Sequence, residues 1–141
     1  MVCTANICRS PVAEHALKGL QPALQVGSAG VDALVGHDID GDARDAAAAL
    51  GLDIPAHRAR QLDAELGRSA DLILVMERHH RDYVGRHLPQ LQGKTFLIGE
   101  FAGIPRIPDP YKQGKAMHIR AAELIMTCAR HWSQQLENMR Q

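Results

Sequence analysis

The sequence predicts an α/β fold with a parallel sheet covered by helices on both faces. Two runs, Leu72–Met76 and Thr95–Ile98, are almost continuously apolar, as expected of strands buried on both sides. Segments of helical periodicity lie between and around these runs, and strands that alternate with helices pair in parallel through right-handed crossovers. With 141 residues, the chain is expected to form one domain over 1–141.

The first half of the chain contributes two helices and a short strand to this prediction. Ser10 and Pro11 suit the start of a helix, and an apolar stripe continues it to Leu20. Leu24–Val26 is the expected strand, and residues 31–41 form a loop rich in glycine and aspartate. The alanine-rich stretch Asp42–Leu50 predicts a second helix, which Gly51 ends.

The second half is expected to begin with one helical turn at Leu62–Leu66. Glu77–Arg86, which directly follows the first apolar run, is predicted to be a helix with a polar face. Three prolines between 105 and 110 make the next stretch a non-helical loop. A long helix over Met117–Met139 closes the chain. Its core face is expected to carry apolar and small residues at spacings of three and four, namely Ile119, Ala122, Met126, Ala129, Ser133 and Leu136.

The composition excludes several classes of protein. Sixteen basic residues balance sixteen acidic ones, so no bulk charge recruits nucleic acid or an anionic membrane. No apolar run reaches the length of a transmembrane helix, and no signal-peptide pattern opens the chain. Three cysteines do not form a secreted disulfide framework. We expect a cytoplasmic protein without membrane insertion; its oligomeric state is left open.

The first eleven residues indicate a binding site for phosphate. Cys3 and Arg9 bracket five residues, and Ser10-Pro11 then opens a helix. A loop that leads into a helix N-terminus can offer backbone N–H donors to an anion, and the guanidinium fork of Arg9 can bind two phosphoryl oxygens. The helix terminus and Arg9 both favour the thiolate of Cys3, the nucleophilic form of cysteine. The pattern therefore predicts a phosphate cradle with a nucleophile at its base.

Cys3-Thr-Ala-Asn-Ile-Cys-Arg-Ser-Pro11 resembles the active-site loop of the low-molecular-weight protein tyrosine phosphatases. Asp109-Pro110-Tyr111 is similar to the general-acid loop of that family, and Ser28–Gly30 and His57–Gln61 also fall where the family has similar stretches. The resemblance covers essentially the whole chain. It implies a four-stranded parallel sheet of flavodoxin-like type. The family's first strand precedes the cysteine, so only Met1 and Val2 remain of it here; we expect this truncation to lower stability.

The resemblance also implies the roles of the site residues. Cys3 is the nucleophile, Arg9 the oxyanion clamp and Asp109 the general acid, with no metal or organic cofactor. The remaining members are the loop residues Thr4, Ala5, Asn6, Ile7, Cys8 and Ser10, the loop supports Ser28 and His57, and the mouth residues Leu34 and Tyr111. Ser10 can donate to the thiolate, cap the helix, or do both. Asp109 between two prolines also fits a purely structural turn.

Cysteine and histidine leave two further hypotheses. Cys8 shares the cradle with Cys3, and a neighbouring thiol can trap an oxidised nucleophile as a disulfide, which makes Cys8 a candidate redox partner. Eight histidines raise the possibility of a metal site, but Cys3-x4-Cys8 has no second cysteine pair and the spacings do not suit structural zinc. Cys128 is expected in the core.

The expected substrate is a phosphotyrosine protein. Residues 33–35 hold no Trp or Tyr, which resembles the bacterial branch of the family, whose partners include tyrosine autokinases of polysaccharide export. Two alternatives stay open. An arsenate reductase has the same fold but needs additional cysteines, and residues 75–91 contain none. A phosphate-binding protein without catalytic activity is the second.

Overall fold

The computed structural model describes residues 1–140, and its elements alternate as the sequence predicts. The four strands are β1 (Val2–Cys3), β2 (Ala29–Gly30), β3 (Ile73–Val75) and β4 (Thr95–Leu97). The helices are α1 (Arg9–Leu20), α2 (Gly41–Ala49), α3 (Ala64–Arg68), α4 (Arg78–His87), the 3₁₀ helix η1 (Pro89–Lys94) and α5 (Lys115–Met139). No helix of residues 1–140 is long and apolar enough to cross a membrane.

The strands form one parallel sheet in the order β2-β1-β3-β4. β1 is internal: Val2 is in register with Ala29 on one side and with Val75 on the other. The carboxyl ends of all four strands therefore lie at the same edge of the sheet, where parallel α/β proteins bind their ligands. The predicted fold class is confirmed.

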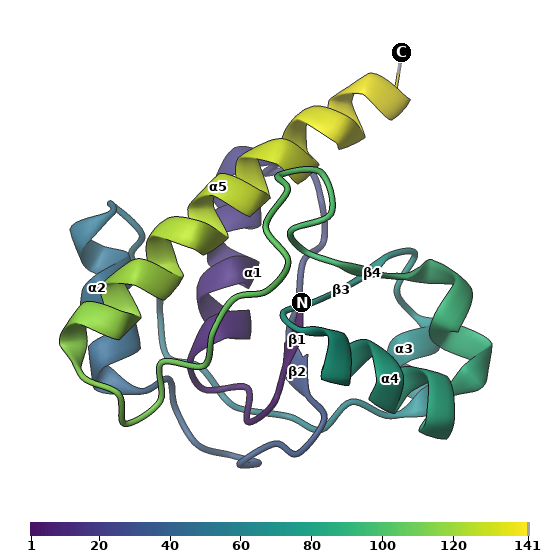
Figure 1. The fold of residues 1–141 in the computed structure, drawn as a ribbon, viewed down its shortest axis with the longest axis horizontal. Helices are drawn as coiled ribbons and strands as arrows, with labels where there is room; N and C mark the ends of the chain where they lie inside the picture. The colour runs from purple at the N-terminus through teal and green to yellow at the C-terminus, as the bar shows by residue number, and fades with distance from the viewer. Residues whose placement is uncertain (141) are drawn as a thin grey trace.

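Helices cover both faces of the sheet (Figure 1). On one face, α1, α2 and α5 enclose a core that receives Leu74 and Met76 from the end of β3. On the other face, α4 and η1 contribute Val84 and Leu91 to a second cluster, which receives Ile73 and Val75. Successive side chains of a strand point to opposite faces, so the apolar run Leu72–Met76 supplies both cores. This explains why it is continuously apolar rather than alternating.

The second strand lies three residues beyond the predicted range. Leu24–Val26 has no regular structure, and the strand is instead Ala29–Gly30. Gly30 packs against the loop that follows β1: a Cβ atom there would lie 2.3 Å from the carbonyl oxygen of Thr4. Glycine is required at position 30 by this close approach, which the apolar pattern of one segment does not reveal.

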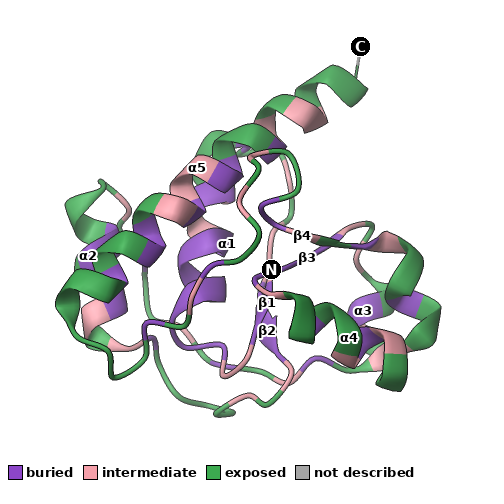
Figure 2. Cartoon of the chain, viewed as in Figure 1, coloured by how far each residue is buried: buried purple, intermediate pink, exposed green. Residues whose placement is uncertain are grey.

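The core face of the long helix is also rotated from the predicted one (Figure 2). Ala122 and Ala129 are buried as expected, but Ile119 is exposed and Met126, Ser133 and Leu136 are only partly buried. The buried face is instead built on His118, Ala121, Ala122, Ile125, Cys128, Ala129 and Trp132. Cys128 lies in the core, as predicted. The helix packs against both α1 and α2, and Trp132 Nε1 donates to the Ile98 carbonyl oxygen at 2.8 Å.

Other boundaries differ by a few residues. The predicted turn at Leu62–Leu66 is the helix α3, which begins at Ala64 after Asp63 accepts a hydrogen bond from the Leu66 N–H. The helix after β3 begins at Arg78 and the last helix at Lys115. The 3₁₀ helix η1 was not predicted, because a proline-led helix of six residues has too little periodicity to be recognised.

Candidate active site

The phosphate-binding pattern forms a loop between the carboxyl end of β1 and the first turn of α1. Cys3 ends the strand, Cys8 is the N-cap residue and Arg9 opens the helix. Within the described residues, no backbone N–H of residues 4–9 donates to a backbone or side-chain acceptor. A run of unpaired N–H groups at a helix N-terminus attracts an anion. The loop is thus built to bind a tetrahedral oxyanion.

Asn6 holds the loop in shape. Its φ angle of 60° lies in the left-handed region, which few residues other than glycine adopt. The side chain is fully buried, and its Oδ1 accepts from the Arg60 N–H at 3.0 Å. The backbone oxygen of Asn6 accepts from His57 Nε2 at 2.7 Å. The structure therefore brings Asn6 and His57 together as the resemblance implied.

Asn6 also fixes the direction of the hydrogen bonds that reach Cys3. Since Oδ1 is the acceptor, Nδ2 is the donor, at 2.8 Å to Ser10 Oγ and 2.9 Å to Ser28 Oγ. The Ser10 hydroxyl thus accepts from Asn6, and its own proton is available for Cys3 Sγ at 2.9 Å. A hydroxyl that donates to sulfur favours the thiolate. Ser10 therefore serves Cys3, while the N-cap position of α1 belongs to Cys8.

At its other end, this series of hydrogen bonds reaches the carboxylate of Glu14, which the sequence analysis did not identify. Ser28 Oγ donates to Glu14 Oε1 at 2.6 Å, and Lys18 Nζ donates to Glu14 Oε2 at 2.6 Å. Burial raises the pKa of Glu14, but the hydrogen bonds from Lys18 and Ser28 outweigh it, so the net pKa is lowered. An ionised Glu14 can only accept, which fixes Ser28 as its donor and orients Asn6 toward Ser10.

Protein acceptors fix the orientation of the Arg9 guanidinium through one of its three nitrogens. Its Nη1 donates to Glu77 Oε2 at 2.6 Å and to the Ile107 carbonyl oxygen at 2.7 Å. By contrast, Nη2 makes only longer contacts, 3.4 Å to Thr4 Oγ1 and 3.9 Å to Asp109 Oδ2. The remaining fork of Nε and Nη2 can bind two oxygens of a phosphoryl group. The side chain is 2% exposed, so the cation is held in place before any ligand arrives.

Glu77 and His80 take part in the site, although the sequence analysis named neither. Glu77 follows the buried strand β3, and His80 Nε2 lies 2.9 Å from Thr4 Oγ1. The rule that ligands bind beyond the carboxyl ends of parallel strands could have indicated Glu77, because it comes one residue after the predicted strand. Burial raises the pKa of Glu77, but its hydrogen bond from Arg9 lowers it, and the net shift is downward.

Asp109 reaches the cradle from a separate loop. Ile107, which is fully buried, anchors this loop by donating its N–H to the Met76 carbonyl oxygen and accepting from Arg9. Asp109 itself is exposed, with Oδ1 accepting from the Tyr111 N–H at 3.1 Å and Oδ2 facing Arg9. The structure thus brings the predicted acid to the same guanidinium that faces the cradle, 106 positions along the chain from Cys3.

Comparison with known proteins identifies the family. The family model described as "Low molecular weight phosphotyrosine protein phosphatase" matches residues 1–141. The chain belongs to this family. It is 39% identical over 136 residues to the low-molecular-weight protein-tyrosine-phosphatase Ptp of Acinetobacter johnsonii, a match that covers 96% of this chain and 95% of that one.

Solved structures agree with the sequence match. The tyrosine phosphatase Wzb from Escherichia coli K30, solved in complex with sulphate, superposes with a TM-score of 0.94 at 38% identity; the match covers 96% of this chain and 94% of Wzb. The YwlE arginine phosphatase from Geobacillus stearothermophilus gives a TM-score of 0.91 at 30% identity, with 98% and 91% covered. This chain is therefore a low-molecular-weight protein-tyrosine phosphatase of bacterial type.

The two predicted mouth residues of this phosphatase lie on different loops. Leu34 is 39% exposed, and its N–H donates to the carbonyl oxygen of Ala5 in the catalytic loop at 3.1 Å. Tyr111 is 37% exposed, with Lys112 Nζ 5.3 Å from the centre of its ring. Both side chains are therefore available at the surface beside the loops that carry Cys3 and Asp109.

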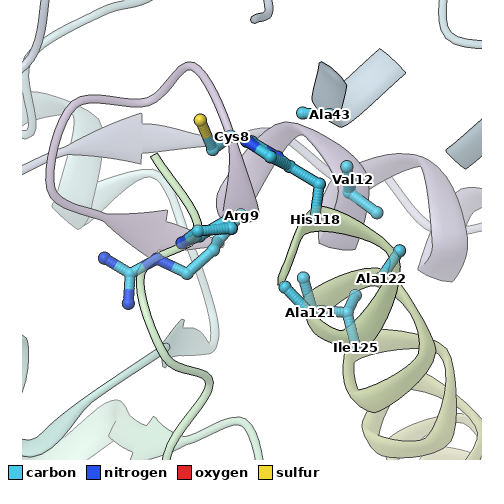
Figure 3. A pocket seen from close by; sticks show the side chains of 9 residues that line it. Cys8, Arg9, Val12, Ala43, His118, Ala121, Ala122 and Ile125 are labelled. Carbon is cyan, nitrogen blue, oxygen red and sulfur yellow. The ribbon is translucent and has the colours of Figure 1, made fainter. Parts of the chain in front are cut away.

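Cys8 lines a small cavity between α1, α2 and α5 (Figure 3). The cavity lining includes Cys8 and His118, and the guanidinium of Arg9 extends away from them. Burial, reinforced by the Asp40 carboxylate, raises the pKa of the Cys8 thiol far above its ordinary value. Cys8 is consequently a neutral thiol in the resting protein.

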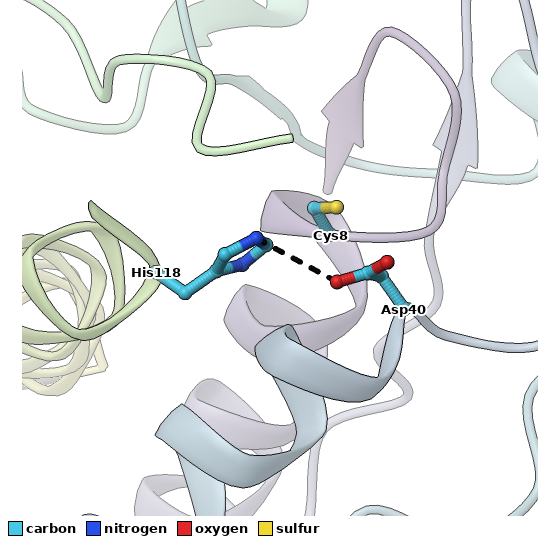
Figure 4. A group of neighbouring side chains, drawn as sticks. All are labelled: Cys8, Asp40 and His118. Atoms are coloured by element: carbon cyan, nitrogen blue, oxygen red, sulfur yellow. Dashed lines mark ion pairs between the residues drawn. The ribbon is translucent and has the colours of Figure 1, made fainter. Parts of the chain in front are cut away.

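Among residues 1–140, two groups of side chains could be considered as metal ligands, and neither fits a metal ion. One is Cys8, Asp40 and His118, in which His118 Nε2 lies 3.6 Å from Asp40 Oδ2 (Figure 4). Its thiol is protonated, whereas metals bind the thiolate, and His118 Nδ1 has no partner to orient the ring. The other is Glu77, His79 and His80, but Glu77 already pairs with Arg9. We assign no metal to either group, and a cofactor-free reaction stays a prediction.

Proposed function

We propose that this phosphatase hydrolyses phosphotyrosine through a covalent phosphocysteine intermediate. The observation that carries the proposal is the directed set of hydrogen bonds ending at Cys3. Asn6 Nδ2 occupies the acceptor side of the Ser10 hydroxyl, whose proton can reach Cys3 Sγ at 2.9 Å or, over the longer distance of 3.4 Å, the Ala29 carbonyl oxygen. The sulfur lies at the base of a loop of unpaired N–H groups, as nucleophilic attack on a bound phosphoryl group requires.

The reaction divides between the two loops. The Cys3 thiolate attacks phosphorus, the bond to the tyrosine oxygen breaks, and the loop N–H groups with Arg9 stabilise the equatorial oxygens. Tyrosine leaves as a phenol whose pKa is about 10, so a proton from Asp109 accelerates its departure. Asp109 then takes a proton from the water that attacks the phosphocysteine, which releases phosphate and regenerates Cys3.

The proposed substrate is a phosphotyrosine protein, and within that class a bacterial tyrosine autokinase of polysaccharide export. The proposal is supported by likeness to bacterial relatives that are named protein-tyrosine phosphatases, including Wzb of Escherichia coli. It is also supported by the mouth, where residues 33–35 offer Leu34 and no aromatic ring. The exposed side chains of Leu34 and Tyr111 can contact a tyrosine on the surface of a folded partner.

Parallel turnover assays test this proposal. Wild-type protein should release phosphate from para-nitrophenyl phosphate and from phosphotyrosine peptides, with much lower kcat/KM on phosphoarginine peptides. Phosphoarginine is included because YwlE, a structural relative, is an arginine phosphatase. Binding of phosphate without turnover would overturn the enzymatic proposal, and preference for phosphoarginine would replace the substrate class. Reduction of arsenate with thioredoxin would instead indicate a reductase, which the buried positions of Cys8 and Cys128 disfavour.

A further inference from the structure

The second residue of the catalytic loop, Thr4, is tied to a buried histidine of α4 whose tautomer the structure fixes. The backbone N–H of Glu77 donates to His80 Nδ1 at 3.1 Å, so Nδ1 must be an acceptor without a proton. The neutral ring therefore carries its proton on Nε2. Burial lowers the pKa of His80 to about 3, in agreement with a neutral ring at the pH of any activity assay.

This tautomer determines how the Thr4 hydroxyl is used. His80 Nε2–H donates to Thr4 Oγ1 at 2.9 Å, and Arg9 Nη2 approaches the same oxygen at 3.4 Å. A hydroxyl has two acceptor lone pairs and one proton. Donors of the protein occupy the acceptor side of Thr4 Oγ1, so its proton must point elsewhere. Within the described residues, Thr4 Oγ1 has no other hydrogen-bond partner.

The position of Thr4 indicates where that proton goes. Its side chain is half-buried, next to Arg9 Nη2, which is one of the two guanidinium nitrogens left for the oxyanion. The Thr4 backbone N–H also belongs to the unpaired set of the loop. We propose that the Thr4 hydroxyl donates a hydrogen bond to a phosphoryl oxygen of the bound substrate, and that His80 is the positioning residue that turns it toward that oxygen.

The inference deepens the proposed function and rests on it for the identity of the substrate. Thr4 would be a catalytic residue through its side chain as well as its backbone, since it touches the reacting phosphoryl group. Glu77 gains a double role, because its side chain aims Arg9 and its backbone N–H sets the tautomer of His80. One residue at the end of β3 would thereby orient two donors of the cradle.

Substitution of Thr4 tests the donor directly. Thr4→Val keeps the shape and removes the hydroxyl, whereas Thr4→Ser keeps the hydroxyl. Isothermal titration with inorganic phosphate should show affinity about tenfold weaker in Thr4→Val, and the loss in Thr4→Ser should be much smaller. For para-nitrophenyl phosphate, kcat/KM of Thr4→Val should fall about 10- to 100-fold, because the donor acts on the developing charge. Equal behaviour of Thr4→Val and Thr4→Ser in both measurements would overturn the proposal.

A double-mutant cycle tests the positioning role of His80. In otherwise wild-type protein, His80→Phe should reproduce most of the loss in kcat/KM that Thr4→Val causes. In the Thr4→Val background, the same change should lower kcat/KM less than about twofold, since its effect passes through Thr4. His80→Gln, whose side-chain N–H can reach Thr4, should recover part of the loss and keeps the test open if His80→Phe does not fold. His87→Phe, the same change on the exposed side of α4, is the matched control. Equal losses from His80→Phe in both backgrounds would show that His80 is merely structural.

Failure of the inference and failure of the proposed function are distinguishable. If wild-type protein binds phosphate but turns over no ester, the proposed function fails, while the titrations still decide whether Thr4 is a donor. If wild-type protein is active and the Thr4→Val and Thr4→Ser titrations coincide, only the inference fails.

Discussion

The catalytic loop of residues 3–10 and the acid loop of residues 107–112 meet at Arg9, but the protein holds them very differently. Each contains a non-glycine residue in the left-handed region, Asn6 at φ 60° and Lys112 at φ 58°. Asn6 is fully buried and hydrogen-bonded through both its side chain and its backbone. Lys112 is exposed, and its side chain lies over the Tyr111 ring.

The difference reflects what each loop must do. Stabilisation of an oxyanion depends on donors that are oriented before the charge develops, and a buried network with fixed directions supplies this. The proposed acid must reach leaving groups on the substrate, and Asp109 is exposed on its loop although Ile107 and Pro110 on either side of it are buried. In the proposed mechanism, the buried loop supplies fixed hydrogen-bond donors and the exposed Asp109 supplies the proton, a division that can be tested by substitution.

The largest effect is expected from removal of the nucleophile in the rigid loop. Cys3→Ser should lower kcat for para-nitrophenyl phosphate by at least about 10³-fold, since a serine hydroxyl in this network is not ionised. Phosphate binding, followed by titration, should persist because the N–H groups and Arg9 remain. Cys128→Ala, which alters a thiol in the core of α5, is the control and should retain turnover. A serine variant that keeps more than a few per cent of the rate would exclude Cys3 as the nucleophile.

The acid loop should show an effect that depends on the leaving group. Asp109→Asn keeps the acceptor for the Tyr111 N–H, so the turn is preserved while the proton is lost. Turnover of phenyl phosphate should fall about 10²- to 10⁴-fold, because phenol is a poor leaving group without protonation. Para-nitrophenyl phosphate, whose leaving phenol is more acidic, should lose far less. Equal losses on both esters would mean that Asp109 is structural.

Oxidation by peroxide should reveal different roles for Cys3 and for the neutral thiol of Cys8. Peroxide converts the Cys3 thiolate to a sulfenic acid, and attack by Cys8 sulfur then forms a disulfide with loss of water. Inactivation should be reversed by dithiothreitol in wild-type protein and become largely irreversible in Cys8→Ser. Peptide mapping checks the pairing, and a Cys3–Cys128 disulfide would contradict it. The raised pKa of Cys8 predicts that disulfide closure, rather than the first oxidation, is the slow step.

The smallest effect concerns the stability that the buried histidine gives to the rigid loop. The pKa of His80 is lowered from 6.5 to about 3 in the folded protein. Its contribution to stability is therefore fully present above pH 6.5 and is lost as the pH falls toward 3, because the unfolded chain takes up a proton that the folded chain refuses. As the pH falls from 6.5 toward 3, the melting temperature of wild-type protein should therefore fall more than that of His80→Phe. His87→Phe, the same change at an exposed position of α4, is the control.

From the sequence by itself, we could predict the fold class and which residues the two loops contain. The apolar runs before Glu77 and at Thr95 predicted buried strands, because a strand covered on both faces has no polar side. Cys3, Arg9 and Ser10 lie close together in the sequence, so their chemistry can be recognised from their spacing alone. Asp109 was identified by resemblance, since its sequence context also fits an ordinary turn.

Tertiary structure alone decided the elements whose identity depends on what packs against them. In β2, Gly30 has no room for a side chain because the carbonyl of Thr4 approaches it too closely. The buried face of α5 follows from its contacts with α1 and α2, which turn His118 inward and leave Ile119 exposed. Glu77 and His80 join the site because parallel strands bring the end of β3 beside the end of β1. Spacing along the chain carries no record of such neighbours, since these contacts span more than 60 residues and arise only when the sheet forms.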